Sequence, residues 1–180
     1  VQRPHPPVWY GARDPENVGW AAPNSVNVVS LGPAARARAI TDRYRKDWAE
    51  LGRNAADIPM MGITRHIVVA PTDAEAKQMA RPAYAMWREA IEMLWARSGV
   101  NFPLTPVYPR SFDELEAIGH GIAGSPATLR DYIGRLQQES GVNYVLAQTM
   151  FGNLGFEEVS TSIRLFAREV APAFAARVAA

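Results

Sequence analysis

The feature that most constrains this sequence is an alternation of strand-like and helical runs, repeated four times along the chain. Short apolar runs predict strands over Val8–Tyr10, Val26–Ser30, Ile63–Val69 and Tyr144–Gln148. A helical pattern follows each of them, and a parallel strand pair needs such a crossover connection. Because the runs are apolar throughout rather than alternating, we expect a parallel sheet covered on both faces.

Helix start signals support this interpretation. Asp14 followed by Pro15 predicts a short helix over Pro15–Ala22, with Asp14 as its N-cap. Other helices are expected over about 33–51, from Thr72 to near Ala96, over 112–118, from Ser125 and from about Phe156. Four βα units make either a small open sheet or half of an eight-stranded barrel.

Composition limits the classes of partner. A chain of 180 residues with 48% hydrophobic residues is about one domain long. Its net charge of +1 provides no general attraction for nucleic acid or anionic membranes. The arginine-rich stretch 36–46 is interrupted by acidic residues, which is typical of the solvated face of an amphipathic helix. There is no cysteine, no apolar run of membrane length and no signal-peptide pattern at the start, so we expect a cytoplasmic protein.

Several motifs of known chemistry are absent or misplaced. GHGIAG at 119–124 matches the spacing G-x-G-x-x-G, but a helical run precedes it, whereas a dinucleotide fingerprint follows a strand. We interpret these glycines as ending one helix and leading into another. His5, His66 and His120 are far apart, so no metal site is expected. His66 lies on a predicted strand, where it either packs or faces a barrel interior.

The turn after the first strand is the main candidate for anion binding. Ligands of parallel α/β folds bind beyond the carboxyl ends of strands, where helix N–H groups attract phosphates. Gly11 and Ala12 leave the backbone accessible, Arg13 offers a charged donor and Asn17 lies in the first helical turn. The alternative is an ordinary βα turn in which Asp14 only caps the helix.

The exit of the fourth strand is a second candidate, because Gln148 and Phe151 leave the sheet at its functional end. The side chains there either wall a flat ring or close the core beneath the last helix. The loop over 97–110 is long and rich in proline, so it is either a lid over the site or an insertion without structure.

The sequence resembles the luciferase-like flavin monooxygenase family, which includes bacterial luciferase. The resemblance is carried by PPVWYGARDPENVGWAA, VNVVS, ITRHIVVAPTDAEA, GSPATLRDYI and the closing segment from ESGVNYVLAQTMFG onward. It extends over residues 1–180, but only to the C-terminal half of the family. It implies a (β/α)8 TIM barrel, of which this chain supplies about four βα units.

The resemblance also implies a cofactor and a site. Family members bind reduced flavin mononucleotide (FMN) or, in one branch, the deazaflavin F420, at the carboxyl end of the barrel strands. The family's phosphate site corresponds here to Gly11, Ala12, Arg13, Asp14 and Asn17, and the end of the next strand, Ser30, approaches the cofactor. The family's substrate-side histidine lies in the half that this sequence lacks, so no catalytic residue is assigned.

These implications give two hypotheses of function. In the first, the chain is part of a flavin-dependent monooxygenase or oxidoreductase that uses dioxygen on a small organic substrate. In the second, it is a non-catalytic half-barrel module for flavin binding or assembly. In either case we expect the missing N-terminal half or a second chain as partner, a source of flavin, and a homo-oligomer such as a dimer.

Overall fold

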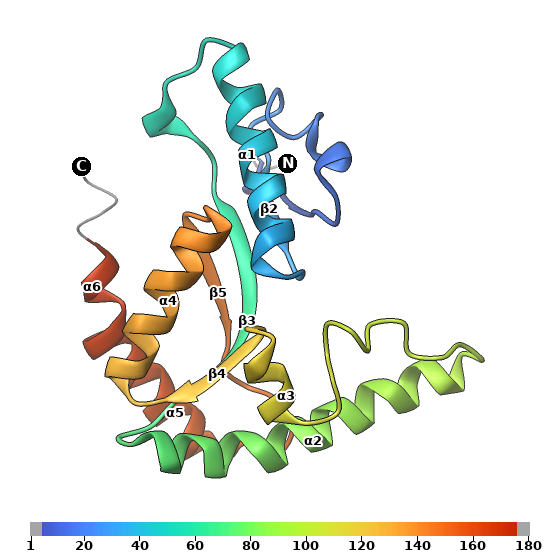
Figure 1. The fold of residues 1–180 in the computed structure, drawn as a ribbon, viewed down its shortest axis with the longest axis vertical. Helices are drawn as coiled ribbons and strands as arrows, with labels where there is room; N and C mark the ends of the chain where they lie inside the picture. The colour runs from blue at the N-terminus through green and yellow to red at the C-terminus, as the bar shows by residue number, and fades with distance from the viewer. Residues whose placement is uncertain (1–4, 176–180) are drawn as a thin grey trace. The chain divides into compact units, whose positions relative to one another are not determined.

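The structure is a computed structural model that describes residues 5–175. It divides into two compact units, each described by itself (Figure 1). Unit 1 consists of the described parts of Val1–Thr64 and Arg135–Leu146, and unit 2 of those of Arg65–Gly134 and Ala147–Ala180. Strand β3 (Met61–Val69), helix α4 (Pro126–Ser140) and strand β5 (Tyr144–Gln148) each contribute residues to both units.

Unit 1 contains the parallel strands that the sequence predicts. β1 (Trp9–Gly11) pairs with β2 (Asn27–Ser30), and β2 pairs with the start of β3 in the register Val28↔Met61. Both pairs are parallel, so the α/β fold class is confirmed and the strand bounds are shifted by one or two residues. The start of β3 is also fixed by Asn143, whose side-chain oxygen accepts from Met61 N at 2.6 Å.

The connections of unit 1 differ in one place from the prediction. The helix expected over Pro15–Ala22 is only a 3-10 turn, η1 (Pro15–Val18), and turns follow it as far as Ser25. α1 (Ala34–Glu50) agrees with the expected helix, and a second 3-10 turn, η2 (Ala55–Asp57), leads to β3. The sequence 19–25 contains two glycine or proline breaks, which explains why the helix stops early.

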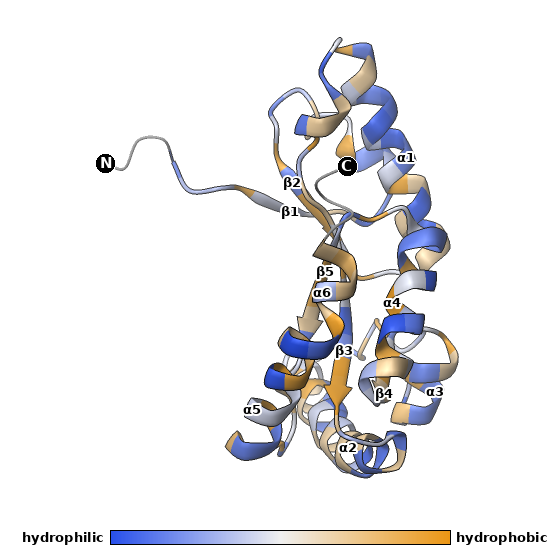
Figure 2. Ribbon diagram, turned by 90° about the vertical axis from the view of Figure 1, so that its left-hand side faces the viewer, coloured by the Kyte–Doolittle hydropathy of each residue, from blue (hydrophilic) through white to orange (hydrophobic). Residues whose placement is uncertain are grey.

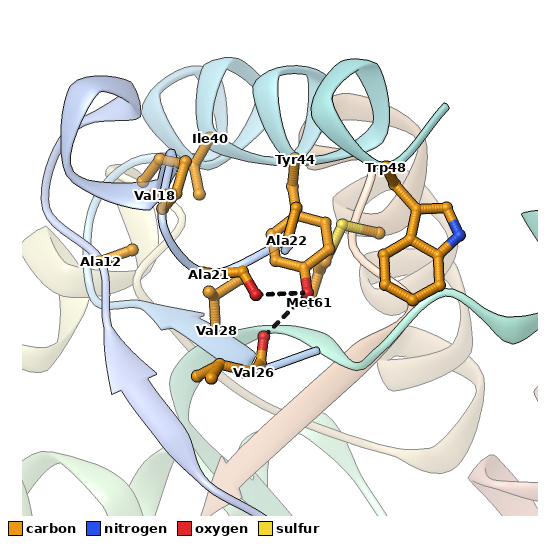
Figure 3. Close-up of a cluster of buried hydrophobic side chains, with 10 residues drawn as sticks. All are labelled: Ala12, Val18, Ala21, Ala22, Val26, Val28, Ile40, Tyr44, Trp48 and Met61. Carbon is orange, nitrogen blue, oxygen red and sulfur yellow. Dashed lines mark hydrogen bonds between the residues drawn. The ribbon is translucent and has the colours of Figure 1, made fainter. Parts of the chain in front are cut away.

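The core of unit 1 lies between β2 and the inner side of α1 (Figure 3). Ile40, Tyr44 and Trp48 follow one another at four-residue spacing on α1, so they share one face. The Tyr44 hydroxyl donates to Val26 O at 2.9 Å and lies 3.5 Å from Ala21 O, while its ring is completely buried. This single hydroxyl therefore joins α1 to the turn before β2.

Replacing Tyr44 with phenylalanine tests this joint. We expect Tyr44→Phe to lower the free energy of unfolding by about 1–2 kcal/mol, because the Val26 carbonyl loses its buried donor while the ring packing remains. Urea denaturation followed by circular dichroism measures the change. A variant as stable as the wild type would show that water or backbone rearrangement replaces this hydrogen bond.

Unit 2 contains the end of β3, the end of β5 and a strand that the sequence analysis missed. β4 (Gly121–Gly124) pairs in parallel with β3 in the register His66↔Gly121 to Val69↔Gly124. The interpretation of GHGIAG as a link between two helices was therefore wrong, although helix α3 (Phe112–Ala117) does precede it. The end of β3 is strongly hydrophobic, as Figure 2 shows.

The glycines of β4 have a packing reason. A Cβ atom at Gly121 would lie 2.6 Å from Leu115 Cδ2, and one at Gly124 would lie 2.8 Å from Thr128 Cγ2. Glycine in a strand interior often marks such a close approach of a neighbouring element. Propensity rules therefore do not predict this strand, because the close contacts with α3 and α4 require glycine at positions where strands usually have larger residues.

Helices surround the β3–β4 pair of unit 2. α2 (Asp73–Arg97) and α3 lie beside β4 (Figure 1). α5 (Phe156–Leu165) continues into a π-helical turn, η3 (Phe166–Val170), and a last short helix, α6 (Pro172–Ala175). α2 stays continuous across Pro82.

The segment after α2 has no regular helix or strand until α3, as predicted for 97–110. It folds back on α2, where the Tyr84 hydroxyl donates to Pro109 O at 2.8 Å and Arg88 Nε donates to Tyr108 O at 2.9 Å. Arg88 also lies over the ring of Phe102 at 4.2 Å. Its function as a lid remains a prediction.

Candidate functional site

The carboxyl ends of β1 and β2 lie side by side in unit 1. Gly11 is in register with Val29, and Ala12 N donates to Val29 O at 2.8 Å. Ser30 is almost fully buried, and its hydroxyl accepts from Gly32 N at 3.1 Å. A Cβ atom at Gly11 would meet no atom within 4 Å, so the space beside this backbone is open.

Asp14 does not cap a helix as predicted. Its backbone is extended, and its side chain accepts no capping hydrogen bond. The carboxylate lies instead 3.5 Å from the guanidinium of Arg36, in the first turn of α1. Asn17 lies on η1 with an exposed side chain. Because one 3-10 turn sums few peptide dipoles, it attracts an anion less strongly than the predicted helix would.

The start of α1 is the strongest positive feature at this edge, and the sequence analysis did not identify it. Its N-cap, Pro33, makes no capping hydrogen bond, and the first turn contains no acidic residue. The first N–H groups therefore keep the partial positive charge of a helix end. Arg36 adds a full charge there, and Arg13 is exposed without an ion pair to any residue of 5–175.

The other main helix starts are occupied by carboxylates. Serine or threonine caps with a glutamate three residues on begin α2 and α3, and Glu158 accepts from Gly155 N at 2.7 Å before α5. At α4, Ser125 N donates to Asp73 at 2.7 Å and the Thr128 hydroxyl donates to it at 2.8 Å. These two hydrogen bonds hold the pKa of the Asp73 carboxyl below its usual value. These helix starts would repel a phosphate, whereas the start of α1 would attract one.

Gln148 and Phe151 lie in unit 2, and nothing relates their position to the edge in unit 1. Gln148 ends β5 and is half-buried, while the next exposed side chain is Met150. Phe151 is 4% exposed and packs in the core of unit 2. The structure thus gives Phe151 the packing role that was the alternative in the sequence analysis, and a contact to a cofactor ring remains a prediction.

A buried group of histidines, which the sequence did not assign to a site, lies in the interior of unit 2. His66 is surrounded by four aromatic rings, with centroids 4.6 Å away at Trp87, 4.9 Å at Phe151, 5.5 Å at Tyr84 and 5.8 Å at Tyr108. The Nε2 atoms of His66 and His120 are buried and have no hydrogen-bond partner among residues 5–175. His120 Nδ1 lies 2.9 Å from Val107 O.

Burial keeps both histidines neutral. Loss of solvent, with a smaller contribution from His120, lowers the pKa of His66 to about 4. Loss of solvent and the nearby charge of Arg65 lower the pKa of His120 to about 4, against the Val107 carbonyl, which raises it. The pKa of the buried Arg65 guanidinium is itself lowered by loss of solvent, although Tyr132 and Tyr108 oppose this. At neutral pH the cluster therefore holds two uncharged imidazoles beside a cation.

Surface hollows do not coincide with the predicted residues. One of about 420 Å³ lies at the amino ends of β1 and β2, lined by Val8, Trp20 and Asn27 among others. That is the opposite edge of unit 1 from Gly11 and Ser30. A second, of about 370 Å³, lies at the carboxyl end of β3 and is lined by Val69, Met79 and Glu157 among others. Its glutamates disfavour an anion.

Two negative findings apply to residues 5–175. No three or more histidine or acidic side chains gather there in a way that would hold a metal ion. None of the helices in this range combines the length and the apolar composition needed to cross a membrane.

The parallel strands and crossover helices define an α/β protein, and the solved structures that it matches are barrels of the (β/α)8 type. Residues 1–144 match the model of the luciferase-like monooxygenase family, and the chain belongs to that family. The predicted resemblance is therefore confirmed.

Similar proteins show the extent of the match. "Uncharacterized protein y4wF" of Sinorhizobium fredii (strain NBRC 101917 / NGR234) is 33% identical over 153 residues, which are 85% of this chain and 44% of that protein. Monooxygenase RslO1 from Streptomyces bottropensis has 22% identity and a TM-score of 0.69, over 97% of this chain and 50% of that one. This chain thus spans about half the length of the proteins that it matches.

Structures with different cofactors share the fold. The oxygenating constituent of 3,6-diketocamphane monooxygenase from Pseudomonas putida, in complex with FMN, has 18% identity and a TM-score of 0.68, over 92% of this chain and 47% of that one. The coenzyme F420-dependent tetrahydromethanopterin reductase from Methanopyrus kandleri has 18% identity and a TM-score of 0.57, over 93% and 51%. The fold alone therefore does not distinguish FMN from F420.

Proposed function

We propose that this chain is part of a flavin-dependent monooxygenase and that it binds the flavin phosphate at the carboxyl ends of β1 and β2. The observation that carries the proposal is the start of α1, which has no capping side chain, no acidic residue in its first turn and an arginine at that place. Membership of the luciferase-like monooxygenase family supports the class of reaction. FMN is the proposed cofactor, with F420 as the alternative.

The residues at this edge fit a phosphate in charge and in space. The amide end of α1, Arg36 and Arg13 provide positive charge, and the open space beside Gly11 lets a ligand approach the backbone. Asp14 partly neutralises Arg36, so Arg13 is the cation with its charge free for a ligand. Ala12, Asn17 and Ser30 lie at or near the same carboxyl ends and are further candidate contacts to the phosphate.

When bound, reduced flavin supplies the chemistry that activates dioxygen for transfer to an organic substrate. In this proposal the chain anchors the phosphate and so fixes how deeply the cofactor is seated. The substrate side belongs to the part of the barrel that lies outside this chain. Phe151 packs in the core of unit 2, so the ring contact predicted from the sequence for Gln148 and Phe151 is not part of this proposal.

Replacing Arg13 tests the phosphate site. We expect Arg13→Ala to weaken FMN binding by about tenfold, because one charge-assisted hydrogen bond to the phosphate is lost. The measurement is a titration followed by flavin fluorescence, with the native protein that contains this chain. Riboflavin, which has no phosphate, should bind wild type and variant equally.

Lys46→Ala is the matched control, since Lys46 is an exposed cation of α1 far along the helix from its start. It should leave FMN affinity unchanged. If Arg13→Ala binds FMN as tightly as the wild type, or loses riboflavin to the same extent, the phosphate role of Arg13 is wrong.

A non-catalytic flavin-binding or assembly module is the second candidate, because the chain spans only about half of the proteins that it matches. The intact mass of the native protein decides whether residues 1–180 are part of a longer chain. Binding of FMN together with oxygen consumption supports the enzyme. Binding without any turnover, by a native product of 19.8 kDa, supports the module.

A further inference from the structure

The segment between α2 and α3, here named the strap (residues 98–110), contacts both buried histidines of unit 2. The carbonyl oxygen of Val107 lies 2.9 Å from His120 Nδ1, and the ring centroid of Tyr108 lies 5.8 Å from that of His66. In Figure 1 the strap leaves the end of α2 and returns along that helix to the start of α3. Two adjacent strap residues therefore help to enclose both imidazoles.

The other walls around His66 are more firmly built than the strap. Tyr84 and Trp87 belong to α2, a helix of 25 residues, and Phe151 packs in the core of unit 2. The strap has no regular helix or strand, and the prolines within it donate no backbone hydrogen bond. Segments of this kind open at a lower free energy than packed helices and strands. The strap is therefore the wall that opens first.

With the strap closed, neither imidazole has a place for a second proton. The Val107 carbonyl accepts from His120 Nδ1, so a further proton on this ring would go to Nε2. The Nε2 atoms of His66 and His120 are buried and have no hydrogen-bond partner among residues 5–175. A charged imidazole has an N–H group at both nitrogens, and a buried N–H group without an acceptor is destabilising, more so when it is charged. Protonation therefore favours a state in which water reaches both rings.

We propose that the strap is an acid-released cover, which opens while the rest of unit 2 stays folded and lets His66 and His120 take up protons. In the closed state, loss of solvent lowers the pKa of both histidines to about 4, whereas a hydrated histidine titrates near 6.5. Between these values the open state binds more protons than the closed one, so the open fraction rises as the pH falls. Above about pH 6.5 both states hold neutral imidazoles, and opening no longer depends on pH.

The other charged and titratable groups around the histidines come from four elements. They are Arg65 of β3, Tyr84 and Arg88 of α2, Tyr108 of the strap and Tyr132 of α4. Burial raises the pKa of the Tyr84 and Tyr108 hydroxyls, so they stay neutral in acid, and the arginines stay charged. The charge of Arg65 disfavours a second cation at His120, which adds to the driving force for opening.

Glu92 is a carboxylate that also ties the strap to α2. One of its oxygens lies 2.9 Å from Nη1 of Arg88, which donates from Nε to Tyr108 O, and the other lies 3.4 Å from Arg110 of the strap. Protonation of Glu92 in acid is therefore the alternative cause of release. Glu92→Gln removes this charge at every pH and is the matched control.

Hydrogen exchange measures the opening directly. The backbone N–H groups of Val107 and Tyr108 both donate to Leu104 O, at 2.9 and 2.8 Å, so their exchange reports on the strap. In the native protein that contains this chain, we expect their protection factors, corrected for the intrinsic pH dependence of exchange, to fall by about tenfold or more between pH 6.5 and 5. Ala70 N, which donates to Gly124 O beside the β3–β4 pair, should stay more protected at every pH.

Two substitutions remove the titrating groups and keep their surroundings. His120→Asn places a side-chain N–H group where it donates to Val107 O, and His66→Phe keeps a ring among the aromatic residues. Each variant should lose about half of the pH dependence on a logarithmic scale, and the double variant should lose all of it. Glu92→Gln should lower the protection of the strap at pH 7.5 and keep the full pH dependence.

Protection factors in the strap that stay constant between pH 6.5 and 5 overturn the proposal. So does equal protection of the strap and of Ala70 N at every pH, because the strap then opens only when the whole unit unfolds. A pH dependence that survives in the double variant, or in both single variants where the double one does not fold, also overturns it, as does one that disappears in Glu92→Gln. None of these outcomes involves FMN, so this proposal and the phosphate site fail separately.

Discussion

Gly152→Ala is expected to destabilise the protein by at least about 3 kcal/mol, because the added methyl group would meet backbone that cannot move aside. A Cβ atom at Gly152 would lie 1.8 Å from Ala83 O and 2.6 Å from Ala83 C. Ala83 is fully buried in the middle of α2, so the helix would have to shift. Gly152 also has a φ of +58°, which an alanine adopts only with strain.

The position explains why the turn after β5 needs this residue. Phe151 directly precedes Gly152 and is buried against His66, which fixes the turn close to α2. The close approach at Gly152 is the consequence. For a chain of this length the loss corresponds to roughly 10 °C in Tm. Differential scanning calorimetry measures it directly.

Gly119→Ala is the control for backbone strain alone. Gly119 follows the C-cap of α3 with a φ of +71°, but a Cβ atom there would meet nothing within 4 Å. We expect a loss of only about 1 kcal/mol. If Gly152→Ala costs no more than Gly119→Ala, the contact with α2 is looser than described, and the left-handed backbone explains the whole effect.

The same close contacts explain what the sequence could predict of the fold. β5 was predicted with its bounds, and α1 and α2 within two residues, because their apolar residues follow a regular period and their ends carry caps or breakers. β4 was missed because two of its four residues are glycines, selected by Leu115 and Thr128 of neighbouring helices. Such tertiary contacts are not visible in a local pattern.

The candidate site shows a similar division. The strand pattern placed Gly11, Ala12 and Ser30 at the carboxyl ends of two strands, the resemblance implied that these strands are neighbours, and the register confirms both. It assigned Asp14 to a cap, because a local rule does not foresee the pairing with Arg36. The signal that could have identified the start of α1 was the absence of acidic residues after Pro33, in contrast to the other helix starts. Rules based on local sequence recognise capping residues, so they do not identify a helix start that has none.

The buried histidines predict that stability falls steeply between pH 6.5 and 4. In the folded protein the pKa values of His66 and His120 are lowered to about 4, whereas an unfolded histidine titrates near its ordinary value of about 6.5. Between these values the unfolded chain binds more protons than the folded one, so acidification favours unfolding. The contribution of the two histidines to the free energy of unfolding is fully present above pH 6.5. Its loss levels off below about pH 4.

The size of the effect follows from the pKa shift. One histidine shifted by about 2.5 pKa units changes the free energy of unfolding by about 3 kcal/mol across this window. The two sites are close enough to influence each other, so their contributions do not simply add. Arg65, Tyr84 and Tyr108 face the same cluster, and none of them titrates in this range. The carboxyl of Asp73, whose pKa is lowered, loses its stabilising bonds only at lower pH.

His66→Phe separates the cluster from other acid effects. It keeps a ring among Trp87, Phe151 and Tyr84 but removes one titrating group. We expect urea unfolding at pH 7.5, 6.5, 5.5 and 4.5 to show a slope about half that of the wild type, with His120 supplying the remainder. His5→Asn, at an exposed position, is the histidine control. If His66→Phe keeps the full slope, a different group drives the acid response. In that case the pKa of His66 is not lowered in solution, because a hydrogen bond stabilises its protonated form.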